Sequence, residues 1–241
     1  MTDNQYRALF AVDCSFLTGK IDDRIEWCRA VSQKLEALIL ELGRGSARST
    51  PASQLGRFVN GGAYTKHASG SGRLVIRIAE LNSGVGGNSK YAELDAPPER
   101  TAFPGDILFS WSATLDAFRW VGEEALVNQH IFKVLPSDRY PGWLVYAKLK
   151  EAMPAFQKLA QDRATTMGHI KRNHLDQVVV EMPTDERLGE IRGLGDDLWK
   201  QHLRVNQEAN NLAQIRDTLL PKLLSGELRV KDPQRLLEGV A

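Results

Sequence analysis

The chain has 241 residues, of which 42% are hydrophobic and 25% are charged, and its formal net charge is +1. This length and composition are typical of a globular protein with a buried core, and no apolar run is long enough to span a bilayer. The near-neutral charge argues against a protein that coats nucleic acid indiscriminately. Because the first residues lack the features of a secretory signal, we expect a soluble, cytoplasmic protein. Cys14 and Cys28 are too far apart for a CxxC pair, so they predict ordinary thiols and no metal site.

The first predicted element is a helix over residues 17–42. Its apolar side chains recur every seven residues at Ile21, Cys28, Leu35 and Leu42, with Ile25, Val31 and Leu38 between them. This spacing is typical of a helix with one apolar seam. The stretch GRGSARSTP that follows is rich in Gly, Ser and Arg and ends at Pro51, which predicts a linker.

The middle of the chain has a different pattern. Short β-branched or aromatic segments bounded by Gly, Pro or Asn predict strands, at residues 73–81, 106–113, 125–135 and 175–183. Residues 141–162 predict a helix, or two helices broken near Pro154. We therefore expect a mixed α+β domain in this region.

A second long helix is predicted from about Thr184 to Leu220, with Thr184 as its N-terminal cap. Its apolar row is Ile191, Leu198, Val205, Leu212 and Leu219, reinforced by Leu194 and Ile215 and interrupted by Gln201 and Glu208. Gly193 and Gly195 weaken its first turns. Both long helices could pack on a globular core as amphipathic elements. Two matching seams instead favour an antiparallel pairing, within the chain or between chains.

Sequence motifs for catalysis are not found. The glycine-rich stretches SGSGRLV and SGVGGNS do not form G-x-G-x-x-G, and the chain has no P-loop, G-x-S-x-G or H-E-x-x-H motif. A general base could in principle be His67, His130, His169 or His174. A single histidine on a polar loop more often forms a structural hydrogen bond or contacts DNA. We expect no cofactor to be bound by this chain.

The polar residues of the middle region fit a surface that contacts DNA. Arg, Lys, Asn, Gln and Ser/Thr are the side chains whose donors and acceptors match base edges. Residues 163–174 carry three formal positive charges, two histidines and no acid. The candidate DNA-binding residues are Lys66, His67, Arg77, Glu80, Asn82, Ser110, Ser112, Asn128, Gln129, His130, Arg163, Thr165, Thr166, His169, Lys171, Arg172 and His174. The alternative for any one of them is turn formation or simple solvent exposure.

Six segments follow one another between residues 17 and 231 in an order known from one protein family. They are LTGKIDDRIEWCRAVSQKLEAL, LVIRIAELNSG, FPGDILFSWSAT, ALVNQHIFKVLP, ATTMGHIKRNHLDQVVVEMP and IRDTLLPKLLSGELRV. In this order they resemble the specificity subunits of type I restriction-modification systems. The first resembles the spacer helix, the middle four the target recognition domain, and the last the C-terminal helix and tail.

The resemblance implies an α+β fold: one mixed target recognition domain flanked by long helices that form an antiparallel coiled coil. The corresponding boundaries are residues 1–50 for the N-terminal segment and spacer helix, 51–183 for the target recognition domain, and 184–241 for the second helix and tail. The Thr-Thr-Met-Gly turn would let the basic loop approach double-stranded DNA, with Arg163, Lys171 and Arg172 on phosphates.

The resemblance also implies a division of labour among subunits. The chain itself would be no enzyme. It would recruit a modification subunit that binds S-adenosylmethionine and flips the adenine, and a restriction subunit that uses ATP and Mg²⁺.

The chain departs from the family pattern because it has one recognition domain where typical members have two. We expect either a homodimer or a truncated or split relative of a full-length subunit, and the initial Met1 favours a natural half. Two other functions stay open. A coiled-coil structural adaptor would lack salt-dependent DNA affinity, and a stand-alone nuclease would cut DNA with Mg²⁺, although no PD…(D/E)xK arrangement is evident.

Overall fold

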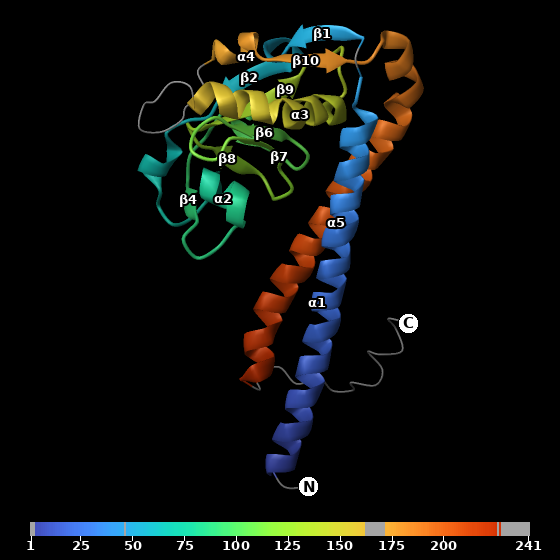
Figure 1. The fold of residues 1–241 in the computed structure, drawn as a ribbon. Helices are drawn as coiled ribbons and strands as arrows, with labels where there is room; N and C mark the ends of the chain where they lie inside the picture. Colours follow the sequence, from blue (N-terminus) through green and yellow to red (C-terminus); the bar gives the residue numbers. More distant parts are fainter. Residues whose placement is uncertain (1–2, 46, 162–171, 226, 228–241) are drawn as a thin grey trace. The chain divides into compact units, whose positions relative to one another are not determined.

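The computed structural model describes residues 3–45, 47–161, 172–225 and 227 (Figure 1). The chain divides into two compact units, one formed by residues 1–33 with 204–241 and the other by residues 34–203. Two long helices, α1 (Asp3–Leu42) and α5 (Asp185–Leu224), each contribute to both units. None of the helices in the described ranges combines the length and the apolar character that a membrane span requires.

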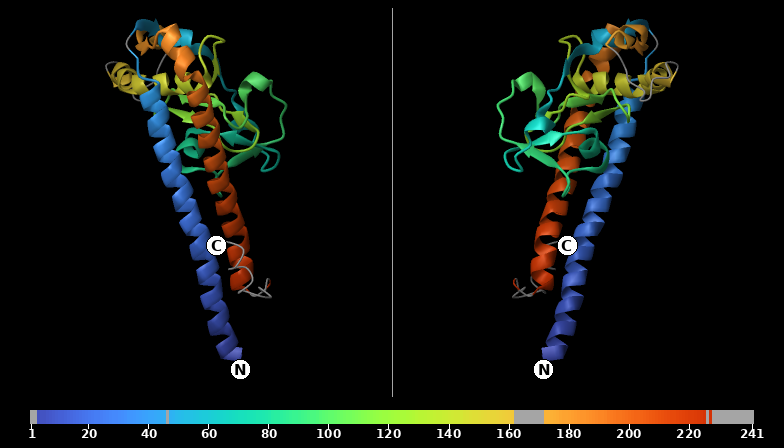
Figure 2. Two further views of the ribbon diagram at one scale, coloured as in Figure 1. Left: turned by 90° about the vertical axis from the view of Figure 1, so that its right-hand side faces the viewer. Right: turned by 90° about the vertical axis from the view of Figure 1, so that its left-hand side faces the viewer.

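In the first unit, α1 and α5 run side by side in opposite directions (Figure 2). Side-chain pairs between them include Asp22 with Arg216 at 2.7 Å, Arg24 with Glu208 at 2.7 Å, and Ser32 with Asn206 at 2.6 Å. Residue numbers rise along one helix as they fall along the other, so the pairing is antiparallel. The predicted pairing of the two helices is therefore confirmed, and it occurs within one chain.

The predicted apolar seams are only partly correct. Ile25 and Cys28 of α1 and Val205 of α5 are buried, but Leu38, Leu194 and Ile215 are 54%, 57% and 47% exposed. The buried positions of α1 keep the seven-residue spacing, but they fall at Ile25, Ser32 and Ile39, so Ser32 and Ile39 take the places predicted for Val31 and Leu38. The helices are also longer than predicted, since α1 begins at Asp3 and α5 ends at Leu224.

The second unit contains two four-stranded sheets and a two-stranded ribbon. The first sheet is antiparallel in the order β2-β9-β6-β7, with β2 at Gly56–Asn60, β9 at Ile131–Pro136, β6 at Ile107–Ser110 and β7 at Asp116–Arg119. The second is mixed in the order β4-β3-β8-β5, with β4 at Lys90–Ala92, β3 at Arg73–Ile76, β8 at Ala125–Val127 and β5 at Thr101–Ala102. The ribbon pairs β1 (Arg48–Pro51) with β10 (Val179–Met182).

The main core of this unit lies where helix α3 (Gly142–Gln161) packs on the first sheet (Figure 1). The ring of Phe156 meets that of Phe109 edge-on, with centroids 5.2 Å apart, and Trp143 is fully buried. Of the two predicted alternatives, the structure has one helix that continues through Pro154. Proline removes one hydrogen bond from a helix interior. Here its ring is exposed, while Met153 and Phe156 beside it are buried and hold the helix on the core.

Several predicted strands are wrong in extent. The segment 73–81 is a strand only to Ile76 and then forms α2 (Ile78–Ser83), and 106–113 is reduced to β6. The segment 125–135 is two strands, and 175–183 starts within α4 (His174–Gln177) before β10. The predicted linker ends in β1. Short 3₁₀ helices complete the fold, at Ala52–Leu55 (η1), Tyr64–His67 (η2) and Pro98–Arg100 (η3). The predicted cap of α5 is confirmed, because Arg187 donates its backbone N–H to Thr184 Oγ1 at 3.0 Å.

His202 lies buried on α5 in the second unit, where its Nδ1 is 3.2 Å from Nη1 of Arg119. A guanidinium can only donate, so this imidazole nitrogen accepts and the ring is neutral. Burial and the neighbouring Arg119 lower the pKa of His202 to about 4, against an opposing attraction from Glu36.

We predict that His202 makes the protein sensitive to acid. The unfolded chain takes up this proton near pH 6.5, whereas the folded protein does so only near pH 4. The stabilisation is complete above pH 6.5 and is lost as the pH falls towards 4, by about 2–3 kcal/mol in total. In denaturant unfolding between pH 7 and 4, the free energy of unfolding of His202→Gln should fall less steeply with decreasing pH than that of the parent protein. His67→Gln, which changes an exposed histidine, should follow the parent curve, and equal slopes for all three proteins would contradict the assignment.

Candidate nucleic-acid interface

Three loops of the second unit meet at one end of the two sheets. Gly61, after β2, donates its N–H to Ile131 O at 3.0 Å, and Gly62 donates to Val127 O at 2.9 Å. Trp111, after β6, donates its N–H to His130 O at 3.3 Å. These backbone bonds fix the loops to one another, so the side chains that they carry share one edge. We call the accessible or partly accessible polar and aromatic residues of these loops, together with one residue of α2, the polar edge: Asn60, Asn82, Trp111, Thr114, Gln129 and His130.

Side chains of the polar edge bond to one another. Trp111 donates its indole N–H to Asn60 Oδ1 at 3.1 Å, and its ring lies 5.4 Å from that of His130. Gln129 Nε2 is 3.3 Å from His130 Nε2. On α2, Asn82 donates from Nδ2 to Thr114 Oγ1 at 3.1 Å, and Thr114 belongs to the same loop as Trp111. The arrangement is a set of amide, imidazole and hydroxyl groups held on short loops.

Gly61 permits the close approach on which this edge depends. A Cβ at Gly61 would collide with the carbonyl oxygens of Val127 and Asn128 and lie 2.6 Å from Asn128 C. Only glycine lets the backbone approach this closely. Asn128 itself is 8% exposed, and its N–H bonds to Ile76 O at 3.1 Å, which ties the turn to β3.

Two buried polar atoms lie in the turn between β8 and β9. Within the described part of the chain, Asn128 Oδ1 and His130 Nδ1 have no hydrogen-bond partner. Both atoms belong to residues that the sequence predicted as DNA contacts. Buried atoms cannot reach a base edge directly, so of these two residues His130 is the better placed for contact through the rest of its partly exposed ring.

Arg77 and Glu80 form a capping network at the start of α2. Glu80 accepts from the Arg77 backbone N–H at 2.9 Å, from its guanidinium at 2.6 and 3.0 Å, and from Ser89 Oγ at 3.0 Å. Its side chain is 2% exposed. Although burial opposes ionisation, the hydrogen bonds from Arg77 and Ser89 lower the pKa of this carboxyl. Glu80 is thus an ionised residue whose hydrogen bonds stabilise the start of α2. It lies on a helix where a strand was predicted.

The other predicted residues fall into buried and exposed sets. Ser110 and Ser112 are buried, and Ser110 Oγ donates to Ser112 O at 3.2 Å, so both shape the loop. His174 is 2% exposed in α4. Lys66 and His67 are exposed on η2. Five predicted residues lie outside the described residues: Arg163, Thr165, Thr166, His169 and Lys171.

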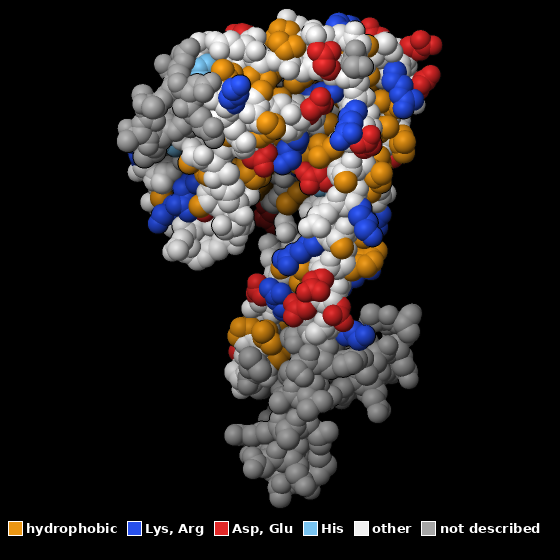
Figure 3. Space-filling model, viewed as in Figure 1, with side chains coloured by type: hydrophobic (Ala, Val, Ile, Leu, Met, Phe, Trp, Pro, Cys, Tyr) orange, Lys and Arg blue, Asp and Glu red, His pale blue; other side chains and the backbone are white. Residues whose placement is uncertain are grey.

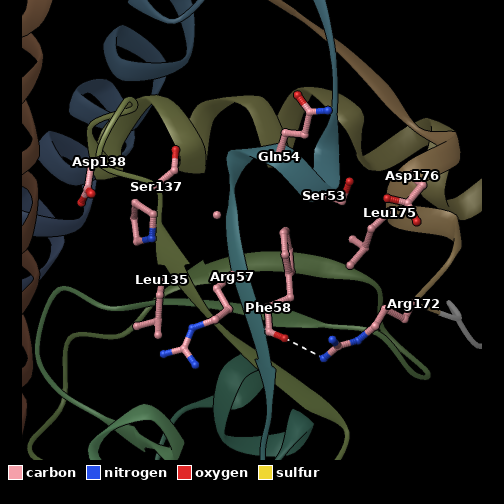
Figure 4. Close-up of a pocket in the computed structure, with 12 residues that line it drawn as sticks. Ser53, Gln54, Arg57, Phe58, Leu135, Ser137, Asp138, Arg172, Leu175 and Asp176 are labelled. Atoms are coloured by element: carbon pink, nitrogen blue, oxygen red, sulfur yellow. Dashed lines mark hydrogen bonds between the residues drawn. The ribbon is translucent and has the colours of Figure 1, made fainter.

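Arg172 lies in an open groove beside β2, with a volume of about 740 Å³ (Figure 4). Its Nη2 donates to Phe58 O at 2.9 Å and so caps a carbonyl on the outer edge of the sheet. Arg57 lines the same groove and pairs with Glu99 at 3.1 Å. Asp138 and Asp176 also line it, so the groove carries both signs of charge.

Charge is also mixed over the described surface shown in Figure 3. Lys and Arg side chains alternate there with Asp and Glu side chains and do not merge into one basic field. Any contact with DNA on this face would therefore depend on shape and on particular side chains more than on bulk attraction. Within the described residues there is no group of three or more His, Cys, Asp or Glu side chains that could hold a metal ion.

Sequence reasoning missed Asn60, Trp111 and Thr114. A usable signal for Trp111 was its position between Ser110 and Ser112, where an aromatic ring interrupts polar residues at a strand end. The contact between Trp111 and Asn60 joins residues far apart in the sequence and could not be read from either segment alone.

The fold is α+β, with a domain that has the polar edge at one end of its two sheets and two long antiparallel helices. A scan of family models finds no match. Among curated proteins, the chain is 26% identical over 125 residues to the specificity subunit of the HindI type I restriction enzyme of Haemophilus influenzae, a match that covers 51% of this chain and 27% of that protein. This relative confirms the resemblance seen in the sequence motifs.

The solved structures that are similar to this chain have TM-scores below 0.5. The HsdS subunit from Thermoanaerobacter tengcongensis has a TM-score of 0.44 at 14% identity and covers 92% of this chain and 58% of its own. The type I S subunit from M. genitalium has a TM-score of 0.45 at 15% identity, with coverages of 91% and 59%. The chain spans about three fifths of these structures and about a quarter of the curated relative.

Proposed function

We propose that the chain is a DNA-sequence specificity subunit of a type I restriction-modification complex. It binds double-stranded DNA and directs adenine methylation and cleavage by partner subunits. The polar edge is the observation that carries the proposal. It presents Gln129 and His130 from a loop that backbone hydrogen bonds hold in place, and Asn82 from α2, and such groups match the donors and acceptors of base edges. The similarity to the HindI specificity subunit supports the same reading.

In this proposal the chain is not an enzyme and binds no cofactor. S-adenosylmethionine would bind to the modification subunit, and ATP with Mg²⁺ to the restriction subunit, in the cytoplasm where the DNA lies. The recognition domain would span residues 51–183, between helical segments at 1–50 and 184–241. Lys171 and Arg163 would add phosphate contacts to those of Arg172.

The homodimer is also a proposal, and the structure changes its basis. The buried seam residues of α1 and α5 pack within one chain, so a dimer would have to use other surfaces of the helices. Two identical recognition domains related by a two-fold axis would read an interrupted palindrome. A chain that is part of a two-domain subunit would contribute to a site with unrelated halves.

The proposal predicts that Gln129 and Lys66 affect DNA binding in different ways. Gln129→Ala should change which bases are preferred, by about 1–3 kcal/mol at the affected position. Lys66→Ala should weaken binding to all sequences alike and flatten the slope of log K against log salt by about one. Fluorescence anisotropy on a panel of duplexes at several salt concentrations measures both effects. Equal losses on every sequence for Gln129→Ala would remove it from the reading surface, and an unchanged slope for Lys66→Ala would remove it from the phosphate contacts.

A further inference from the structure

The loop between α2 and β4 presents an apolar side chain to solvent. From Leu81 to Ser89 the sequence has no charged residue, and residues 82–88 are all exposed. Figure 1 shows this loop at the opposite end of the domain from β10. At its centre is Val85, which is 55% exposed. The loop thus combines one exposed valine with glycines and uncharged polar residues.

Hydrogen bonds fix the backbone of this loop on both sides of Val85. Gly84 donates its N–H to Glu80 O at 3.1 Å. Gly86 donates its N–H to Ser89 Oγ at 3.0 Å and accepts at its carbonyl from the Ser89 N–H at 2.9 Å. Because valine is β-branched, rotation about its χ1 bond is also restricted. The side chain is therefore largely ordered before a ligand binds, which lowers the entropic cost of binding.

The glycines around Val85 leave room for a ligand. Within the described part of the chain, no atom lies within 4 Å of the position of a Cβ at Gly84, Gly86 or Gly87. Gly84 has a φ of +78°, in the left-handed region that favours glycine. A ligand can consequently approach the backbone of the loop as closely as it approaches the valine.

Helix α2 joins this loop to the polar edge. Asn82, three residues before Val85, donates to Thr114 Oγ1 at 3.1 Å, and both residues belong to the polar edge. On the proposed function, the ligand at this edge is double-stranded DNA. The major groove offers one apolar group beside its donors and acceptors, the C5-methyl group of thymine. Side chains that DNA-binding proteins insert between base pairs are larger or longer, such as Phe, Leu and Met, so the isopropyl group of valine is better suited to the methyl group.

We propose that Val85 contacts the C5-methyl group of a thymine in the DNA target and makes the chain specific for an A·T pair at that position. The inference rests on the proposed function. It adds an apolar contact to a reading surface whose other members supply hydrogen-bond donors, acceptors and aromatic rings.

The test uses the duplex that the full chain selects together with its modification subunit. Each thymine is replaced in turn by deoxyuridine, which lacks only the C5-methyl group. At one position this change should weaken binding of the parent protein by about three- to fivefold, the effect of losing one buried methyl group. Val85→Ser should bind the thymine duplex more weakly by the same factor, and deoxyuridine at that position should then have no further effect. Val85→Ile keeps an apolar side chain and should keep the sensitivity.

Val179→Ser is the matched control, because Val179 on β10 is a valine of similar exposure, at 52%. It should respond to deoxyuridine as the parent does. The contact would be overturned, with the proposed function left standing, by any of three results: equal sensitivity in Val85→Ser and the parent, a parent that tolerates deoxyuridine at every position, or a selected target without an A·T pair. A selection that enriches no sequence would overturn the proposed function and this contact with it.

Discussion

Replacing Gly195 with alanine should destabilise the protein by about 2–3 kcal/mol, although alanine is the better helix former. A Cβ at Gly195 would collide with Cε2 of the Trp143 indole and lie 2.5 Å from its Cζ2 and Nε1. Trp143 is fully buried and cannot move aside without disturbing the core beneath α3. The glycine that seemed only to weaken α5 therefore lets the helix pass directly over the indole.

Gly193 provides the matched control on the same helix. No atom lies within 4 Å of the position of a Cβ there. Gly193→Ala should therefore stabilise the protein by about 0.5–1 kcal/mol through helix propensity alone. Urea unfolding followed by circular dichroism measures both variants. If the two alanines shift the midpoint in the same direction, the packing of Trp143 on α5 is wrong.

Replacing Glu80 with alanine should cost about 3 kcal/mol of stability and leave the DNA base preference unchanged. The change leaves the Arg77 guanidinium and backbone N–H, and the Ser89 hydroxyl, without their common acceptor. The carboxylate is 2% exposed, so it has no free surface to offer to a base.

Glu93→Ala is the control, because Glu93 is exposed and accepts one hydrogen bond from Ser71 Oγ at 2.7 Å. Its loss should cost less than about 0.5 kcal/mol. Thermal unfolding gives the stabilities, and duplex binding below the unfolding transition gives the base preference. A stable Glu80→Ala protein with altered base preference would return Glu80 to the reading surface.

The long helices could be predicted from the sequence because their signal is local. Seven-residue spacing identified both of them and their antiparallel pairing. The exact buried face could not be predicted in this way. It depends on which partner faces each turn: Ser32, which accepts a bond from Asn206, is buried in place of the predicted Val31.

The sheets were harder to predict because their strands are short and pair over long distances. Strand β2 pairs with β9, which is remote in sequence, and β3 pairs in parallel with β8. The segment 73–81 was predicted as one strand, but after Arg77 it forms a helix. Ser89, from a later loop, helps to hold Glu80 in that helix. Local β propensity carries no information about such a partner.

Only part of the candidate site could be predicted, because it too is formed by segments that are far apart in the sequence. Polar residues at strand ends pointed to Asn82, Gln129 and His130, and these share the polar edge with Asn60 and Trp111. Ser110 and Ser112 looked equivalent in the sequence but are buried. Residue type alone does not tell whether a hydroxyl closes a loop or faces a ligand.

The most direct test of the account is selection of bound duplexes from a random pool, with the full chain and its modification subunit present. The proposed function predicts one enriched sequence motif interrupted by a fixed gap, with binding that weakens as salt increases. Identical inverted halves in that motif would support the homodimer, and unrelated halves a two-domain subunit. A recovered pool with no enriched sequence, from a complex in which both proteins are shown to be folded and associated, would contradict the claim that this chain reads DNA.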